Sequence, residues 1–204
     1  MSTRLPRRLL LGNSGAGAEP SATLPTSAPE EQLVSFVAYG EDCILSGEAV
    51  LDAGRLTDML NANDEYSLAG VTVERFNDDA PLAVAEIVVA RDEIFLVHAT
   101  GPRGDMARRQ HTSPQHLAIK LGPYEVRGFF HALPGADPVV ALRRRKAMVP
   151  LTDARIGYTI RGERREVRVD TLIVNREQID WVEQVMPSQT EFPTGPDRLL
   201  PKPA

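Results

Sequence analysis

Residues 87–97 read IVVARDEIFLV, and residues 172–182, which lie 85 positions later, read LIVNREQIDWV. Four of the eleven aligned pairs are identical and four more are chemically similar. Each segment has an apolar, β-branched run, then an arginine followed by an acidic residue, then a second apolar run. This order is typical of two β-strands joined by a short turn. The recurrence predicts that the chain contains two copies of one β module.

The match between the two halves extends upstream of these segments. Gly47 aligns with Gly128 at a spacing of 81, and Leu68 aligns with Leu151 at a spacing of 83. The drift in spacing requires only small loop insertions, which cost little. Two unrelated hairpins could share a Val/Ile pattern, but the shared Arg-acid turn weakens that alternative. We therefore predict a mainly β fold with two tandem small β-barrel or roll units, each with one short helix, packed around a pseudo-two-fold axis.

One short helix is predicted in each half. In the first half Asp52 offers an N-cap, apolar residues at helical spacing follow, and Asn61 is a suitable residue to end the helix. In the second half Asp137 precedes a proline at the first helical position, and we expect that helix to run to Lys146.

Composition divides the chain into five segments. Residues 1–32 are rich in Gly, Ala, Ser, Pro and Thr without any regular period, which predicts a disordered tail. Residues 33–98 form the first predicted β unit, and residues 99–119 are polar and predict a linker. Residues 120–183 form the second β unit. Residues 184–204 are proline-rich and predict a second disordered tail.

The two predicted units carry different charges. Residues 33–98 contain 3 Lys+Arg and 13 Asp+Glu, a balance of −10. Residues 120–183 contain 12 and 9, a balance of +3. Opposite charges favour contact between the two halves or between copies of the chain. Alternatively, the basic half binds an anion.

Five basic residues form the candidate binding site. Arg143, Arg144, Arg145 and Lys146 lie at the predicted C-terminus of the second helix, where the helix dipole favours cations. Arg155 follows on the next predicted strand. A structural or solvated role is one interpretation of the cluster, and contact with a phosphate, a nucleic acid or a partner is the other. Few aromatic residues flank the cluster, which does not favour base stacking.

We find no catalytic or metal-binding pattern in the sequence. There is no Gly-x-Ser-x-Gly motif and no convincing Cys-His pair. The single cysteine, Cys43, adjoins apolar residues and is predicted to be a small buried hydrophobe. His111 and His116 lie in the predicted linker, where we expect them to be solvated. We therefore predict no metal, no cofactor and no enzymatic activity.

A family resemblance rests on residues 55–61, which read RLTDMLN and follow a predicted strand with a glycine. This run resembles the signature of an uncharacterised family of small bacterial β domains, a domain of unknown function. In that family an Arg-Leu-Ser/Thr-Asp-x-Leu-Asn segment precedes a strand that begins Leu-Thr-Asp-Ala, as residues 151–154 do here. The second half has ALRRR at residues 141–145 instead of the first motif. The resemblance covers roughly residues 33–183 and implies no activity.

The function that we predict is binding. A non-enzymatic adaptor or regulatory module would recognise a protein partner or a second copy of itself. The alternative is a nucleic-acid or anionic-ligand binder that works through the basic second half. The net charge of −5 argues for solubility rather than for a nucleic-acid partner. A lone cysteine fits a reducing cytoplasm, and because no apolar run reaches about 18 residues we predict no membrane partner.

Overall fold

The computed structural model describes residues 32–51, 54–78, 80–100 and 111–185. All of them belong to one compact unit, residues 31–204. The predicted tails lie outside the described residues except at Gln32, Gln184 and Val185.

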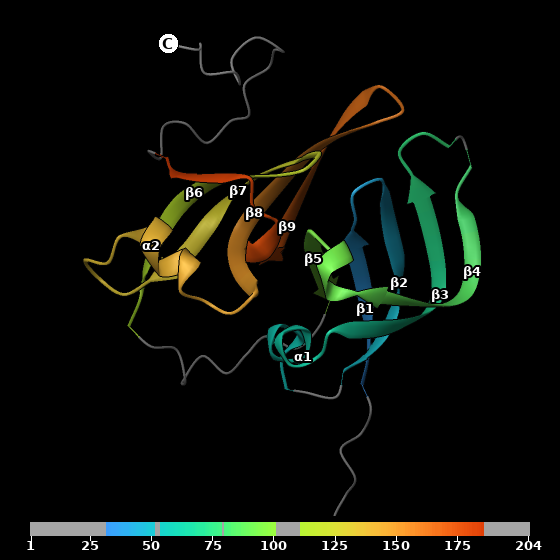
Figure 1. Cartoon of the computed structure of the whole chain (residues 1–204), viewed down its shortest axis with the longest axis horizontal. Helices are drawn as coiled ribbons and strands as arrows, with labels where there is room; N and C mark the ends of the chain where they lie inside the picture. Colours follow the sequence, from blue (N-terminus) through green and yellow to red (C-terminus); the bar gives the residue numbers. More distant parts are fainter. Residues whose placement is uncertain (1–31, 52–53, 79, 101–110, 186–204) are drawn as a thin grey trace, which may run out of the picture. The chain divides into compact units, whose positions relative to one another are not determined.

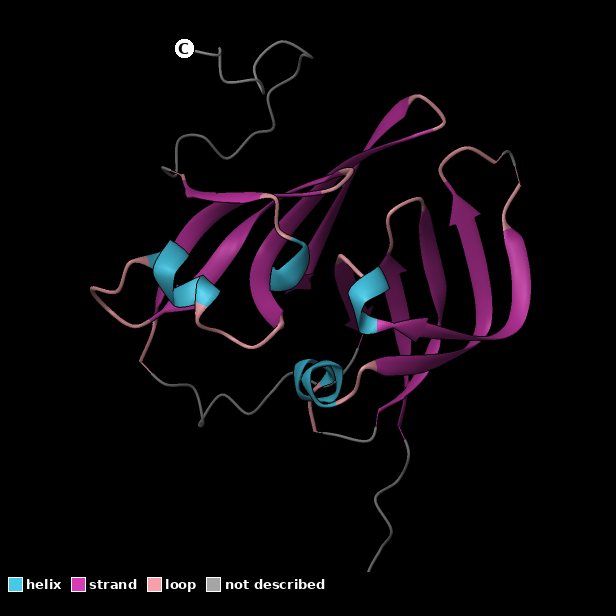
Figure 2. Ribbon diagram, in the orientation of Figure 1, coloured by secondary structure: helices cyan, strands magenta, loops and turns pink. Residues whose placement is uncertain are grey.

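The described part of the chain is mainly β, as predicted (Figure 1), and two short α-helices interrupt the strands (Figure 2). In chain order the elements of the first half are β1 (Gln32–Tyr39), β2 (Cys43–Leu51), α1 (Leu56–Ala62), β3 (Glu65–Arg75), β4 (Leu82–Ala90), the 3-10 turn η1 (Arg91–Glu93) and β5 (Leu96–Thr100). Those of the second half are β6 (Ser113–Leu121), β7 (Tyr124–Ala132), α2 (Pro138–Arg143), β8 (Met148–Ile160), β9 (Glu163–Asn175), the 3-10 turn η3 (Arg176–Gln178) and β10 (Trp181–Gln184).

All ten strands belong to one antiparallel sheet with the order β10-β6-β7-β8-β9-β5-β1-β2-β3-β4. The order in the first half, β5-β1-β2-β3-β4, recurs in the second half as β10-β6-β7-β8-β9. The halves join where β5 pairs with β9, with Leu96 opposite Val174 and Val97 opposite Ile173. The predicted two-fold axis would pair β10 with β4 in the same way. Instead, β10 and β4 are the two ends of the sheet that the described residues form, and the sheet does not close.

Both halves contain the same irregularity. The register between β2 and β3 shifts beside Gly47, and Gly70 on β3 has a φ of +58°. The register between β7 and β8 shifts beside Gly128, and Asp153 on β8 has a φ of +46°. A Cβ on Gly47 would lie 2.9 Å from a backbone carbonyl oxygen of β3, and one on Gly128 would lie 3.1 Å from an alanine Cβ of β8. The neighbouring strand therefore leaves no room for a side chain at Gly47, and a side chain at Gly128 would need the β8 alanine to shift by a few tenths of an ångström.

The aligned Arg-acid segments form equivalent 3-10 turns. The N–H of Arg91 donates to the carbonyl of Asp64 at 2.7 Å, and the N–H of Arg176 donates to the carbonyl of Ala147 at 2.7 Å. Each turn ends at an isoleucine, Ile94 or Ile179, which are aligned in the sequence. The hydrogen bonds of the two halves thus follow the sequence alignment.

Each half has its own apolar core, and each core contains side chains from the other half. The core of the first half includes Met148 and Ile173 from the second. The core of the second half includes Tyr39, Ile44 and Leu96 from the first. Burial of this kind is the main favourable term in folding, so the two halves stabilise one another.

The predicted linker needs correction. β6 begins at Ser113, so residues 113–119 form a strand, and residues 101–110 lie outside the described part. The polar residues that suggested a linker share this strand with buried residues that face the core. His116 is only 6% exposed and stacks on Phe129 with 5.0 Å between ring centroids, so it is not a solvated histidine.

Both helices differ from the prediction at their ends. Asn61 lies within α1 rather than ending it, because its side-chain amide bonds to the backbone of Met148 on β8. The predicted N-cap, Asp52, lies outside the described residues. Helix α2 ends at Arg143, not at Lys146, because the next residues must reach the start of β8.

Candidate functional site

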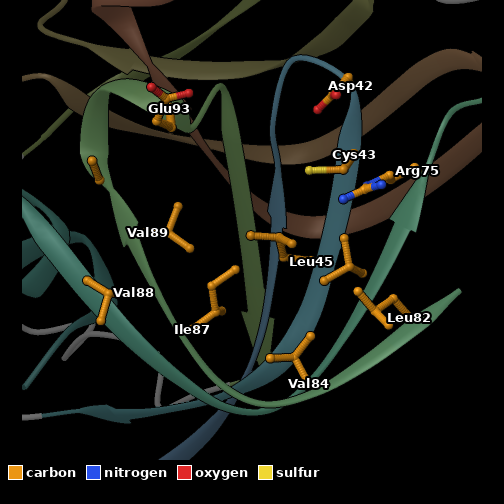
Figure 3. A pocket seen from close by; sticks show the side chains of 12 residues that line it. Asp42, Cys43, Leu45, Arg75, Leu82, Val84, Ile87, Val88, Val89 and Glu93 are labelled. Carbon is orange, nitrogen blue, oxygen red and sulfur yellow. The ribbon is translucent and has the colours of Figure 1, made fainter.

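A pocket lies in the curve of β2, β3 and β4 in the first half (Figure 3). Its volume is about 600 Å³, within the range of ligand-binding pockets. The residues that line it are Asp42, Cys43, Leu45, Val73, Arg75, Leu82, Val84, Ile87, Val88, Val89, Ala90 and Glu93.

The pocket is apolar within and charged at one end. Figure 3 shows Leu45 and Ile87 turned toward its centre, whereas Asp42, Arg75 and Glu93 lie toward one end. An apolar side chain would therefore be accepted inside, and a polar or basic group would be accommodated at the charged end.

Cys43 sits at that charged end, opposite Arg75 in the pairing of β2 with β3. Cys43 is half-buried, and burial together with the Asp42 carboxylate raises the pKa of its thiol to about 11. The thiol is therefore protonated near neutral pH and is a poor nucleophile. The Arg75 guanidinium forms an ion pair with Asp78 at 3.2 Å.

The counterpart of this pocket in the second half is filled. By the alignment of the strands, Tyr124 occupies the position of Cys43, and Tyr158 occupies the position of Arg75. Tyr124 is 0% exposed and Tyr158 is 5% exposed. The second half thus places two large rings where the first half has a thiol and a guanidinium.

Side chains of the first half complete the filling. The ring centroid of Tyr39 lies 5.5 Å from that of Tyr124 and 6.0 Å from that of Tyr158. The ring of Phe76 lies 6.0 Å and 6.1 Å from the same two rings. Burial raises the pKa of the Tyr124 hydroxyl, which stays protonated and donates to the carbonyl of Gly40 at 2.6 Å. The interior of the second half is therefore closed by aromatic residues from the first half.

The pairing of β5 with β9 continues this contact at the backbone. The N–H of Asn175 donates to the carbonyl of Phe95 at 2.8 Å. The Asn175 side chain, which is 1% exposed, donates to the carbonyls of Arg91 at 3.0 Å and Ile94 at 2.9 Å. The counterpart of Asn175 in the first half is Ala90, which carries no such donor.

Strand β4 is the first-half counterpart of β9, and no strand of the described residues pairs with its outer side. The N–H of Arg91 bonds to Asp64 beside β3, so by antiparallel alternation the N–H groups of Val88 and Ala90 point away from β3. Leu82 and Val88 are 55% and 58% exposed. A long apolar edge of this kind is a site at which another strand pairs.

The structure does not bring the five predicted basic residues together. Residues 143–146 are all exposed at the end of α2 and just after it. Arg145 lies 5.8 Å from the centroid of the Phe130 ring and donates to the carbonyl of His131. Arg155 pairs with Arg127 on β7, which lies four positions before His131. At about 3.3 Å per residue, this places it about 13 Å from that end of the strand.

Arg155 belongs instead to a row of three arginines across neighbouring strands. Arg127 on β7 lies opposite Arg155 on β8, which lies opposite Arg168 on β9. Arg155 forms an ion pair with Glu166 at 3.5 Å, and Arg168 forms one with Asp153 at 2.7 Å. Sequence reasoning missed this row because it depends on the register of three strands.

Sequence reasoning also missed the pocket and the β4 edge. The signal was present in the alignment of the two halves, where Cys43 faces Tyr124 and Ala90 faces Asn175. A small residue aligned with a large, buried one marks a place where one half lacks a filling group or a partner.

Among the residues that the structure describes, no group of three or more His, Cys, Asp or Glu side chains is placed to hold a metal ion. The described helices are also too short to cross a membrane as apolar segments.

Comparison with known proteins supplies no relative. No family model matches the chain, and no curated protein or solved structure matches it either. The resemblance to small bacterial β domains therefore stays a prediction.

Proposed function

We propose that the chain is a non-enzymatic binding protein whose first half receives an extended segment of another polypeptide along β4. The supporting observation is the pairing of β5 with β9, because β9 is the counterpart of β4. The edge of β9 pairs with a strand of the first half, and side chains of the first half fill the interior beside it. We expect β4 and its pocket to bind a segment of the same kind. In this proposal the two halves are tandem copies of one β roll. The protein binds its partner without a cofactor and works in the cytoplasm.

The chemistry of β4 suits strand addition. Backbone bonds along the edge would supply affinity, and the adjoining pocket would select side chains. The walls of the pocket favour aliphatic or aromatic groups, as the interior of the second half accepts Tyr39 and Phe76. Asp42 and Glu93 at the charged end favour a basic group on the same segment.

A peptide that copies residues 93–100, EIFLVHAT, tests the proposal, because this segment contains the strand that pairs with β9. With a fluorescent label, we expect its anisotropy to rise on titration with the full chain. The substitution Ala90→Pro removes an outward N–H, and the φ of Ala90, −75°, suits proline. It should weaken binding by about tenfold or more, which corresponds to the loss of about 1.4 kcal/mol.

Matched lysine substitutions provide the control. Val88 and Val140 are exposed to similar degrees, 58% and 45%, but only Val88 lies on β4. Val88→Lys should weaken peptide binding, whereas Val140→Lys on α2 should leave it unchanged. Peptide binding that ignores both β4 substitutions, or no binding at millimolar peptide, would contradict the proposal.

The basic second half remains a second candidate site, for nucleic acid or another anion, and the arginine row favours it. Arg155 and Arg168 form ion pairs with carboxylates, which an anion would have to displace. The test is the affinity for a single-stranded oligonucleotide as a function of salt. Binding through this surface should weaken steeply with salt and should fall further in Arg144→Glu and Arg155→Glu.

A further inference from the structure

We propose that the occupant of the β4 edge is the β10 edge of a second copy of this chain, so that chains associate head to tail. This inference rests on the proposed function, because it names the polypeptide that β4 receives. Its basis is the order of the strands: β10 is the counterpart of β5, and β4 is the counterpart of β9. The two ends of the sheet are therefore the same two edges that already pair at its centre.

The internal junction specifies the register of the contact between copies. It consists of two residue pairs between β5 and β9. Their counterparts on the open edges place Trp181 opposite Val89 and Val182 opposite Val88. The carbonyl of Asp180 would accept from the N–H of Ala90, as the carbonyl of Phe95 accepts from Asn175.

The backbone of β10 is oriented for this pairing. The N–H of Val185 donates to the carbonyl of His116, so alternate residues of β10 bond to β6. By antiparallel alternation the N–H of Val182 points away from β6. On β4 the N–H of Val88 points outward in the same way, so both edges present donors and acceptors to an incoming strand.

Exposed apolar side chains lie on both of these edges. Seven large apolar side chains are exposed in the described part of the chain, and three of them lie on β4 and β10: Leu82, Val88 and Trp181. Trp181 is 40% exposed, whereas its counterpart Leu96, which the internal junction covers, is 0% exposed. A second copy would cover Val88 and Trp181 as the internal junction covers Leu96.

Charge favours the head-to-tail arrangement. Residues 33–98 have a balance of −10 and residues 120–183 a balance of +3, so contact between two first halves would bring like charges together. Lys120, the counterpart of Tyr39, would reach the end of the pocket where two carboxylates and one guanidinium lie, those of Asp42, Glu93 and Arg75. The contact should therefore weaken in salt. It should also be weaker than the internal junction, because Ala90 lacks the amide of Asn175.

Sedimentation of the full chain with two edge variants tests the proposal. Wild-type chain should show an average mass that rises with concentration above that of one chain. Ala90→Pro blocks β4 and leaves β10 intact, and Trp181→Lys blocks β10 and leaves β4 intact. Each variant alone should have the mass of one chain, because every contact needs one edge of each kind. An equal mixture should form a dimer of the two variants and nothing larger.

Three results would overturn the proposal. The first is a wild-type chain that keeps the mass of one chain at the highest concentration reached. The second is association that survives Trp181→Lys, since contact between two β4 edges does not need β10. The third is a mixture of the variants that shows no dimer although both keep the circular dichroism spectrum of the wild type. If the peptide of residues 93–100 still binds β4 in any of these cases, only self-association fails and the proposed function stands.

A disulfide between copies tests the register. In a Cys43→Ala background, Val88→Cys and Val182→Cys in separate chains should form a cross-linked dimer on mild oxidation. The pair Val140→Cys and Val182→Cys should not. Equal cross-linking by both pairs would overturn the register that the internal junction specifies.

Discussion

Replacement of Asn175 by alanine is the sharpest test of how the two halves are joined. The Asn175 side chain is 1% exposed and takes part in three hydrogen bonds. It donates to the carbonyls of Arg91 and Ile94 in the first half and accepts from the N–H of Glu177. Alanine removes all three bonds and leaves a buried carbonyl at Ile94 without this donor.

The expected loss follows from these contacts. At about 1 kcal/mol for each net hydrogen bond, Asn175→Ala should lower the free energy of unfolding by about 3 kcal/mol. At about 2–4 °C per kcal/mol for a chain of this size, the melting temperature should fall by about 6–12 °C. Asn175→Asp should cost more, because it places a carboxylate against two carbonyl oxygens in a buried site.

Urea denaturation followed by circular dichroism measures the effect. Glu163→Gln, an exposed substitution at the first residue of β9, is the control and should change stability by no more than about 0.5 kcal/mol. A loss below about 0.5 kcal/mol for Asn175→Ala would show that the junction between β5 and β9 does not depend on this side chain.

Three further predictions follow from single side chains. Gly47→Ala should lower the free energy of unfolding by about 1–3 kcal/mol, because the new Cβ would meet the carbonyl oxygen of Ala69 at 2.9 Å. Gly54→Ala is the control and should leave stability unchanged, because nothing lies within 4 Å of its Cβ. Equal melting temperatures for the two variants would contradict this prediction. Iodoacetamide should alkylate Cys43 at pH 8 roughly two orders of magnitude more slowly than a free thiol, because the Cys43 pKa of about 11 leaves little thiolate. Alkylation at the rate of glutathione would refute the burial of this thiol. Burial lowers the pKa of His116 below 6.5, so the unfolded chain takes up a proton at a higher pH than the folded chain, and stability should fall as the pH drops below about 6.5. His116→Gln should make stability depend less on pH in that range. An unchanged slope would mean that other groups cause the dependence.

Local sequence patterns were enough to predict the class of the fold and the similarity of its two halves. Alternation of apolar residues and the Arg-acid turns are local patterns, and local patterns predict strands and turns well. The sequence aligned Gly47 with Gly128, and the structure places both at a shift of register, which the sequence analysis did not predict.

How the two halves meet, and which of their edges stays open, is set by contacts in the tertiary structure. Whether β5 pairs with β9, and whether β10 pairs with β4, depends on contacts between residues that are distant in the chain, and no local pattern encodes them. The same applies to the row of arginines that contains Arg155, which exists only in the register of three strands. The pocket exists because Cys43 and Arg75 stand where the other half has tyrosines, and because no aromatic residue comparable to Tyr39 enters it from the described part of the chain. A sequence shows such a difference in size, but only packing shows that the space is left unfilled.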